Sequence, residues 1–291
     1  MKNVWMAVVA MIGLFSMMGI GSKAEPASAA GLLSGGFLAE EGTPPPGAND
    51  PRCRPTPDHP YPVVLVPGTF ETMERNWINL APLLKEKGYC VFALNYGYSN
   101  GIPASGPVAD SAVELKGFID NVLALTGAEK VSIVGHSQGG MMPRQYMKFL
   151  GGGNKVEDLI GLVPSNHGTD GVAGLSKLTS TGADVTSCAA CQDQATGSEF
   201  LTKLNSGDET PGSASFTIVT TRNDEIVVPY HSAFLEGPAK ETANITIQDY
   251  FPYDQIEHQN IAQDPLAFKF VFDALEHDGP ADGRRASGLF E

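Results

Sequence analysis

Short apolar runs alternate with amphipathic segments over most of the chain, and this alternation constrains the fold more than any other feature. The expected strands lie within YPVVLVPG, YCVFALNYG, KVSIVGHS, VEDLIGLVPSNHG, SFTIVTTRNDEIV and NITIQDYF. The expected helices lie within WINLAPLLKEKG, VADSAVELKGFIDNVLALTG, GGMMPRQYMKFLGGG and PLAFKFVFDALEH, with a shorter helical stretch around 198–204. Strands separated by helices predict an α/β fold: a mostly parallel central sheet with helices on both faces. Ligands of such sheets bind beyond the carboxyl ends of the strands.

The alternation has no break that would separate two domains, so we expect a single domain over residues 61–277. Residues 30–60 are rich in Gly, Pro and Ala and predict an extended N-terminal arm. Residues 278–291 have the composition of a flexible C-terminal tail.

Residues 1–29 have the pattern of a cleaved signal peptide. Lys2 supplies a positive start, residues 4–20 form an apolar run, and Ala27-Ser28-Ala29 is a small-x-small cleavage site. The run is shorter than the ~20 apolar residues of a membrane-spanning helix and contains glycine and serine. We therefore expect a secreted protein without an integral membrane segment.

Secretion changes the interpretation of the four cysteines, because disulfides persist in oxidising compartments. The spacing favours the pairs Cys53–Cys90 and Cys188–Cys191. The alternatives for CAAC are a redox motif or half of a zinc site. No second CxxC or spaced histidine pair completes a zinc site, and this CxxC is not expected to open a helix after a strand.

The net charge of −14 disfavours two classes of partner. Nucleic-acid binding needs clustered Lys and Arg, and none is present. Electrostatic docking on anionic lipid is disfavoured for the same reason. The residues with candidate functions contain no metal-ligand set, so we expect neither a metal nor a cofactor.

The segment GHSQG places a serine between two glycines where a strand pattern changes to a helix pattern. It matches G-x-S-x-G, in which a sharp strand-to-helix turn exposes a nucleophilic serine, here Ser137. The alternative is a tight turn with a solvated hydroxyl. The strand before and the helix after the motif favour the nucleophile.

A serine nucleophile needs a histidine base that is oriented by a carboxylate, in the chain order Ser, acid, His on this kind of sheet. Five histidines lie before the acid, close behind it or at the end of the last helix: His59, His136, His167, His231 and His277. His258 remains, between the last strand and the last helix. His136 is expected to pack beside the serine.

Asp224 is the expected acid because it directly follows the strand FTIVTTR. Glu225 next to it could substitute, although an adjacent residue points in a different direction, and Asp254 is a possible local partner of His258. Asp193 and Asp208 fall in irregular segments and are expected to be solvated.

Two backbone N–H groups should stabilise the oxyanion of such a site. One is that of Gln138, at the start of the helix after the serine. The other comes from the loop after the first strand, where Thr69 and Phe70 are equal candidates. Phe70 and Met141 are candidates for an apolar acyl-binding wall, with a plain core role as the alternative for Met141.

Four segments together resemble the secreted bacterial triacylglycerol lipases of the class 2 group. They are VVLVPGTF, WINLAPLLKEKGY, TRNDEIVVPY and the long stretch GAEKVSIVGHSQGGMMPRQYMKFLGGGNKVEDLIGLVPSNHGTD. The resemblance extends over residues 53–275, strongest to actinobacterial members and weaker to the small lidless lipase of Bacillus. It implies an α/β-hydrolase fold and hydrolysis of carboxylic esters, acylglycerols or other lipids.

Carried over position by position, the resemblance implies Ser137, Asp224 and His258 as the catalytic triad, with an oxyanion hole at Thr69 or Phe70 and Gln138. The chain departs from the Bacillus type in its longer arm and its enlarged segment 169–200, which is a candidate for a cap over the site. The alternatives are a cutinase-like polyester hydrolase, an acyltransferase, a peptidase, or a secreted binding protein on an inactive hydrolase fold. Neither the acyl length nor the oligomeric state is predicted.

Overall fold

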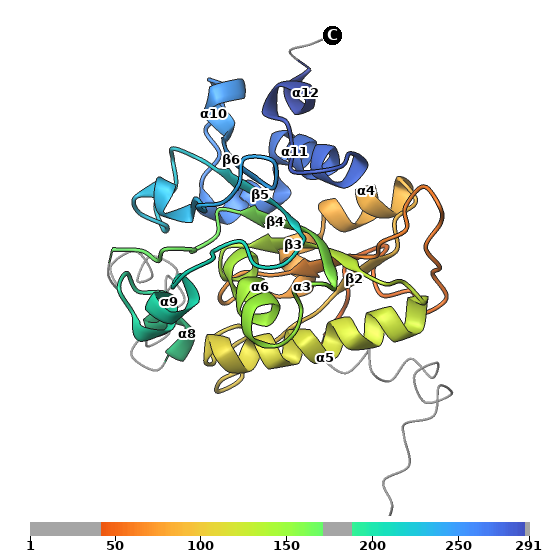
Figure 1. The fold of residues 1–291 in the computed structure, drawn as a ribbon, viewed down its shortest axis with the longest axis horizontal. Coiled ribbons are helices and arrows are strands. Elements are labelled where there is room, and N and C mark those ends of the chain that lie inside the picture. The colour runs from red at the N-terminus through yellow and green to blue at the C-terminus, as the bar shows by residue number, and fades with distance from the viewer. Residues whose placement is uncertain (1–41, 171–187, 289–291) are drawn as a thin grey trace, which may run out of the picture.

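The computed structural model describes residues 42–170 and 188–288 and is built around a six-stranded parallel sheet (Figure 1). The strand order is β2-β1-β3-β4-β5-β6, and every pair is parallel. The strands are β1 (Val63–Val66), β2 (Val91–Ala93), β3 (Val131–His136), β4 (Val156–Leu162), β5 (Ser215–Thr220) and β6 (Thr242–Thr246). The expected parallel α/β architecture is confirmed. The expected signal peptide and residues 30–41 of the arm lie outside the described residues.

Helices cover both faces of the sheet (Figure 1). One face packs against α5 (Val108–Thr126), α6 (Gln138–Phe149) and α9 (Glu199–Leu204), and the other packs against α3 (Met73–Trp77), α4 (Leu80–Glu86) and α11 (Pro265–Glu276). Neighbouring residues of β1 point to opposite faces, with Val64 and Val66 in the first core and Val63 and Leu65 in the second. Both faces are therefore dry, which explains why the strands are apolar throughout.

The segment expected to form one helix over WINLAPLLKEKG forms two, α3 and α4. Thr72 caps α3 by accepting a hydrogen bond from Arg75 N–H, and α4 begins at Leu80. Pro82 has no N–H, so no i→i−4 hydrogen bond joins it to Ile78. The proline instead occupies the first turn of α4, where a missing donor costs little.

The described part of the arm, residues 42–60, lies along the edge strand β2. The Asn49 N–H donates to Val91 O at 2.9 Å, and the Asn49 side chain bonds both the N–H and the carbonyl of Ala93. The Cys53–Cys90 disulfide fixes the arm beside the start of the same strand. The arm thus satisfies backbone groups that an open sheet edge would expose.

The CAAC segment forms the expected Cys188–Cys191 disulfide, and it also opens a short helix. Cys188 is the N-cap of the short helix α8 (Ala189–Asp193), and its sulfur accepts from Cys191 N–H. Residues 171–187 of the expected cap segment lie outside the described residues.

The C-terminal region differs from the flexible tail expected over 278–291. Residues Gly283–Ser287 form a helix, α12, capped by Asp282. Arg285 holds it against α11 with two hydrogen bonds to Asp273, at 2.6 and 2.7 Å. The sequence gives little sign of this helix because its contacts are an ion pair, backbone hydrogen bonds and two alanines rather than a long apolar stripe. Residues 289–291 lie outside the described residues.

The shorter elements are the helix α10 (Ile247–Tyr250), which ends the segment expected to be all strand, and the 3₁₀ helices η2 (Tyr230–Ala233) and η3 (His258–Gln263). In the described part of the chain, no helix is both long and apolar enough to span a bilayer.

Candidate active site

The sheet order brings together two loops that are far apart in sequence. The chain leaves β1 for β2 on one side and returns to β3 on the other, so the loops after β1 and β3 diverge at neighbouring strand ends. This is a topological switch point, where open α/β sheets bind ligands. The loop after β1 carries Thr69, and the turn after β3 carries Ser137.

Ser137 occupies a sharp and sterically demanding turn between β3 and α6. Its φ of 53° and ψ of −121° are unusual for a residue with a side chain. The flanking glycines make the turn possible: a Cβ on Gly135 would lie 1.9 Å from Gly139 O, and one on Gly139 would lie 2.2 Å from Val66 O. The G-x-S-x-G spacing is therefore a steric requirement of this strand-to-helix turn.

Ser137, His258 and Asp224 form one hydrogen-bonded chain. His258 Nε2 lies 3.0 Å from Ser137 Oγ, and His258 Nδ1 lies 2.9 and 3.0 Å from the two carboxylate oxygens of Asp224. All three residues are buried. A carboxylate that holds one imidazole nitrogen while the other meets a hydroxyl is the geometry that activates a serine.

Backbone contacts hold the carboxylate and the imidazole in register. Asp224 Oδ1 accepts from the N–H groups of Ile226 and Val227, at 2.9 and 2.8 Å. Glu225, which the sequence left open as a substitute acid, instead accepts from the backbone N–H of His258 at 3.2 Å. Asp254, the other possible partner, accepts from Ile256 N–H at 2.8 Å. The geometry thus singles out Asp224 as the partner of the imidazole.

His136 lies behind the site, fully buried beneath His258. Its ring nitrogens are 3.1 Å from Asn76 Oδ1 and 3.0 Å from the backbone carbonyl oxygen of His258. Burial, with a smaller contribution from the nearby charge of His258, lowers the pKa of His136 to about 3. The ring is therefore neutral at ordinary pH and supports the base rather than acting as one.

The loop after β1 passes directly beside the serine. Gly68 comes so close that a Cβ there would lie 2.9 Å from His136 Nδ1 and 3.3 Å from Ser137 Cβ. The Phe70 N–H donates to Pro103 O at 3.2 Å, so it is already committed. Among the described residues, the N–H groups of Thr69 and Gln138 have no hydrogen-bond partner. This favours Thr69 over Phe70 as the second oxyanion donor.

The two candidates for an acyl-binding wall differ in burial. Met141 is fully buried in the core on the α6 face, which is the alternative that the sequence left open for it. Phe70 is half-buried and packs against the same core. Of the two, only Phe70 retains exposed side-chain surface.

His167 lies in a separate polar cluster. Its Nε2 lies 2.9 Å from Glu209 Oε1, and its Nδ1 lies 3.1 Å from Ser232 O. The hydrogen bond to Glu209 raises the pKa of His167. Burial alone would raise the pKa of Glu209, but the His167 contact and the Glu236 N–H outweigh it and lower that pKa. His167 therefore has a hydrogen-bonding role in the loop after β4.

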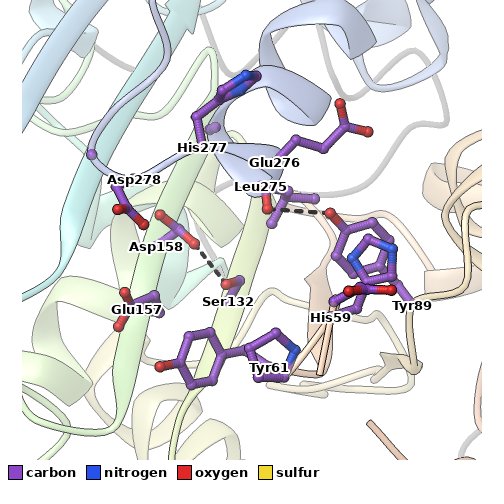
Figure 2. A pocket seen from close by; sticks show the side chains of 14 residues that line it. His59, Tyr61, Tyr89, Ser132, Glu157, Asp158, Leu275, Glu276, His277 and Asp278 are labelled. Atoms are coloured by element: carbon purple, nitrogen blue, oxygen red, sulfur yellow. Dashed lines mark hydrogen bonds between the residues drawn. The ribbon is translucent and has the colours of Figure 1, made fainter. Parts of the chain in front are cut away.

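A cavity of about 180 Å³ lies at the amino ends of the strands, away from the triad (Figure 2). It is bordered by the amino ends of β3 and β4, the end of α11 and the arm. Figure 2 shows Asp158 hydrogen-bonded to Ser132 and Tyr89 hydrogen-bonded to the Leu275 carbonyl. Burial is the main cause that raises the pKa of Asp158 to about 7. Because Ser132 lies near the start of β3 and Ser137 follows its end, this cavity is separate from the triad.

Within residues 42–170 and 188–288, no group of three or more His, Cys, Asp or Glu is arranged to hold a metal ion.

Two residues that border the site had no recognisable signal in the sequence. Asn76 lies on α3, and its Oδ1 accepts from Gly68 N–H at 2.9 Å while it contacts His136. Gln194 follows α8 and contacts the side chains of both Thr69 and Gln138. Both act across long sequence separations, where periodicity and local motifs carry no information.

Comparison with known proteins was made against families, individual relatives and solved structures. The sequence model of the family described as Lipase (class 2) matches residues 60–271. A triacylglycerol lipase from Pseudarthrobacter phenanthrenivorans is 33% identical over 89 residues, which are 29% of this chain and 27% of the relative. A triacylglycerol lipase from Burkholderia plantarii is 33% identical over 89 residues, 29% of this chain and 24% of the relative. The matches span about a quarter of the length of these relatives.

The structure is similar to the crystal structure of Aspergillus fumigatus lipase B, with a TM-score of 0.66 and 24% sequence identity. The similarity covers 79% of this chain and 55% of that one. It supports the fold alone, which is the α/β-hydrolase architecture expected from the sequence.

Proposed function

Because the chain belongs to the class 2 lipase family, we propose that it is a serine carboxylic-ester hydrolase that cleaves acylglycerols. The observation that carries the proposal is the continuous hydrogen-bond chain from Ser137 through His258 to Asp224. The likeness to two triacylglycerol lipases supports the choice of an acylglycerol as substrate.

In the proposed reaction, Ser137 Oγ attacks the ester carbonyl carbon while His258 Nε2 takes its proton. The Asp224 carboxylate stabilises the imidazolium that forms and keeps its Nδ1–H in place. The N–H groups of Thr69 and Gln138 stabilise the oxyanion of the tetrahedral intermediate. His258 then protonates the leaving alcohol, and an acyl-enzyme remains on Ser137.

Water completes the cycle by the same route in reverse. His258 removes a proton from a water molecule, the hydroxide attacks the acyl carbon, and the carboxylic acid leaves as Ser137 regains its proton. No step calls for a metal or an organic cofactor, since the protein supplies base, nucleophile and oxyanion donors.

The test is Ser137→Ala in the full chain, assayed on short nitrophenyl esters and on an emulsified triacylglycerol. We expect kcat to fall by at least about 10⁴-fold, because the attacking atom is removed. A fluorophosphonate probe should label the wild type at Ser137. The matched control is Ser287→Ala on the remote helix α12, which should retain activity and labelling. A Ser137→Ala variant that still hydrolyses esters through its own site would refute the proposal.

The same assay identifies the preferred substrate. A series of esters of increasing acyl length, together with a polyester film, separates an acylglycerol lipase from a cutinase-like enzyme. Product analysis with an added alcohol detects acyl transfer. We propose an acylglycerol preference, so activity confined to the film or to alcohol acceptors would contradict it.

We also propose that the protein is exported. The two disulfides support this, because such bonds are maintained in oxidising compartments. Recovery from the culture medium of a chain that starts after Ala29 tests it, and retention of the uncut chain in the cell would contradict it.

A further inference from the structure

Gln194 lies where the disulfide-bonded helix α8 meets the back of the candidate oxyanion hole. It is the C-cap of α8 and only 1% exposed. Its partners are 56 residues away at Gln138 and 125 residues away at Thr69. A side chain from a third segment therefore contacts both residues that supply the free N–H groups of the hole.

The contacts form a closed triangle of side chains. Gln194 Nε2 donates to Thr69 Oγ1 at 3.0 Å and to Gln138 Oε1 at 3.2 Å. The Thr69 hydroxyl donates in turn to Gln138 Oε1 at 2.7 Å. All three residues are buried. Each side of the triangle thus helps to fix the rotamers of the residues it joins.

The orientation of the Gln194 amide is set by two further groups. Ser165 Oγ donates to Gln194 Oε1 at 2.8 Å, so the oxygen faces Ser165. The nitrogen faces Ala190 O, at 3.0 Å. With its donor end directed at Thr69 and Gln138, Gln194 requires the Gln138 amide to present its oxygen. In this orientation, Gln138 Nε2 is buried without a partner among the described residues.

The helix that carries Gln194 is itself tied to the body of the protein. The Cys188–Cys191 disulfide closes its first turn, and Ala190 N–H donates to Ser105 O at 3.1 Å. The backbone carbonyl of Gln194 accepts from Thr169 N–H at 3.1 Å. The Gln194 amide that contacts the oxyanion hole is therefore carried by a segment that is fixed to the rest of the fold.

We propose that Gln194 is a positioning residue that pre-orients the oxyanion hole by locking Thr69 and Gln138 to each other. The inference rests on the proposed function, because it assigns the two backbone N–H groups to the oxyanion. Donors stabilise a transition state most when they are already aimed at the position where charge develops. Gln194 touches no reacting atom and acts only through its two neighbours.

The main variant is Gln194→Met, which keeps the length of the side chain but removes the donor. We expect kcat to fall about 10-fold to 100-fold, while KM changes by less than about twofold, because the loss falls on the transition state. An alkyl trifluoromethyl ketone, which forms a tetrahedral oxyanion on Ser137, should bind more weakly by the same factor.

The matched control is Ser198→Ala, which removes the cap of α9 and the hydrogen bond to Asp193 O beside α8. It loosens the same region without contacting the hole, so it should lower Tm and leave kcat and ketone binding unchanged. If Ser198→Ala lowers kcat as much as Gln194→Met, or if ketone binding is unaffected in Gln194→Met, the positioning role is refuted.

Two further variants keep the test decisive if Gln194→Met does not fold. Ser165→Ala frees the Gln194 amide to rotate and should lower kcat by about threefold. Thr69→Val retains the backbone N–H but breaks the triangle. In the double variant with Gln194→Met, the fold-loss of kcat should be smaller than the product of the two single fold-losses. Independent, multiplicative losses would contradict the proposal, as would a Ser165→Ala enzyme with unchanged kcat.

The rate of fluorophosphonate labelling at Ser137 separates this inference from the proposed function. A wild type that hydrolyses no ester but is labelled, with slower labelling in Gln194→Met, refutes the ester-hydrolase proposal and supports the positioning role. If the wild type is active and Gln194→Met changes neither kcat nor the labelling rate, the ester-hydrolase proposal is supported and the positioning role is refuted.

Discussion

Replacing the buried carboxyl of Asp158 by an amide should stabilise the protein above about pH 4, and most strongly at neutral and higher pH. Asp158 lies near the start of β4 at 7% exposure, and its Oδ2 accepts from Ser132 Oγ at 2.7 Å. Burial is the largest cause that raises its pKa; the Ser132 hydrogen bond opposes this, and the nearby charge of Glu157 adds to it. The Asp158→Asn variant would keep the shape of the side chain and the acceptor for Ser132 but carry no charge.

The magnitude follows from the two titration points. The carboxyl titrates near 3.8 in the unfolded chain and at about 7 in the fold. Between these values the folded protein holds one more proton than the unfolded chain, so stability falls as pH rises, by about 1.4 kcal/mol per pH unit. The full interval amounts to roughly 4 kcal/mol, which is an upper bound because water in the cavity screens the charge. Well below the unfolded value both states are protonated and the penalty vanishes.

Urea unfolding of Asp158→Asn and of the wild type at pH 4.5 and pH 8 measures the effect. We expect a gain for the variant of at most about 1 kcal/mol at pH 4.5, because that pH lies only just above the unfolded pKa, and a gain that is larger by more than about 1 kcal/mol at pH 8, with unchanged m-values. Glu86→Gln, which removes an exposed carboxyl from the end of α4, is the control and should show no such gain. A gain that is the same at both pH values, or larger at pH 4.5, would show that burial of the charge is not its cause.

Two further outcomes concern the cross-links and the ion pair outside the site. Replacing Cys53 and Cys90 by serine opens a link of 37 residues and should lower the free energy of unfolding by about 4 kcal/mol, whereas opening the three-residue Cys188–Cys191 link should lower it by about 1.6 kcal/mol. Denaturant unfolding of the two double variants measures both losses. An equal loss from both variants would contradict the loop-entropy explanation. Glu209→Gln should lower Tm at pH 5.5 by an amount equivalent to about 1 kcal/mol and by less at pH 8.5. The raised pKa of His167 makes the pair stabilising below its unfolded value and ineffective once pH rises through the folded value, so a larger loss at pH 8.5 would contradict this reasoning.

The sequence allowed the central fold to be predicted because its signals are local. Buried parallel strands have continuous apolar runs, and the apolar residues of amphipathic helices recur with a period of 3.6 residues. The sequence therefore predicts the sheet and its major helices. The predictions failed where short segments depend on contacts outside the segment or on one backbone group. α12 is held against α11 by contacts with Asp273, among them the Arg285 ion pair, and α3 separates from α4 at one missing proline N–H.

For the candidate site, the sequence by itself determined the members of the hydrogen-bonded chain. A serine between glycines at a strand end, followed in order by Asp224 and His258, is a pattern of type and order that requires no distances. The spacing of the cysteines likewise predicted both disulfide pairs: Cys188 and Cys191 are near neighbours, which leaves Cys53 to pair with Cys90.

Only the tertiary structure decided which groups surround that chain. Phe70 N–H is committed to Pro103 O, which leaves Thr69 N–H free, and Met141 is fully buried in the core. Gln194 reaches the hole because α8 docks beside the loop after β1. These contacts join segments between 33 and 125 residues apart. They depend on the order in which the strands assemble, which places the ends of β1 and β3 side by side and which no short window of sequence encodes.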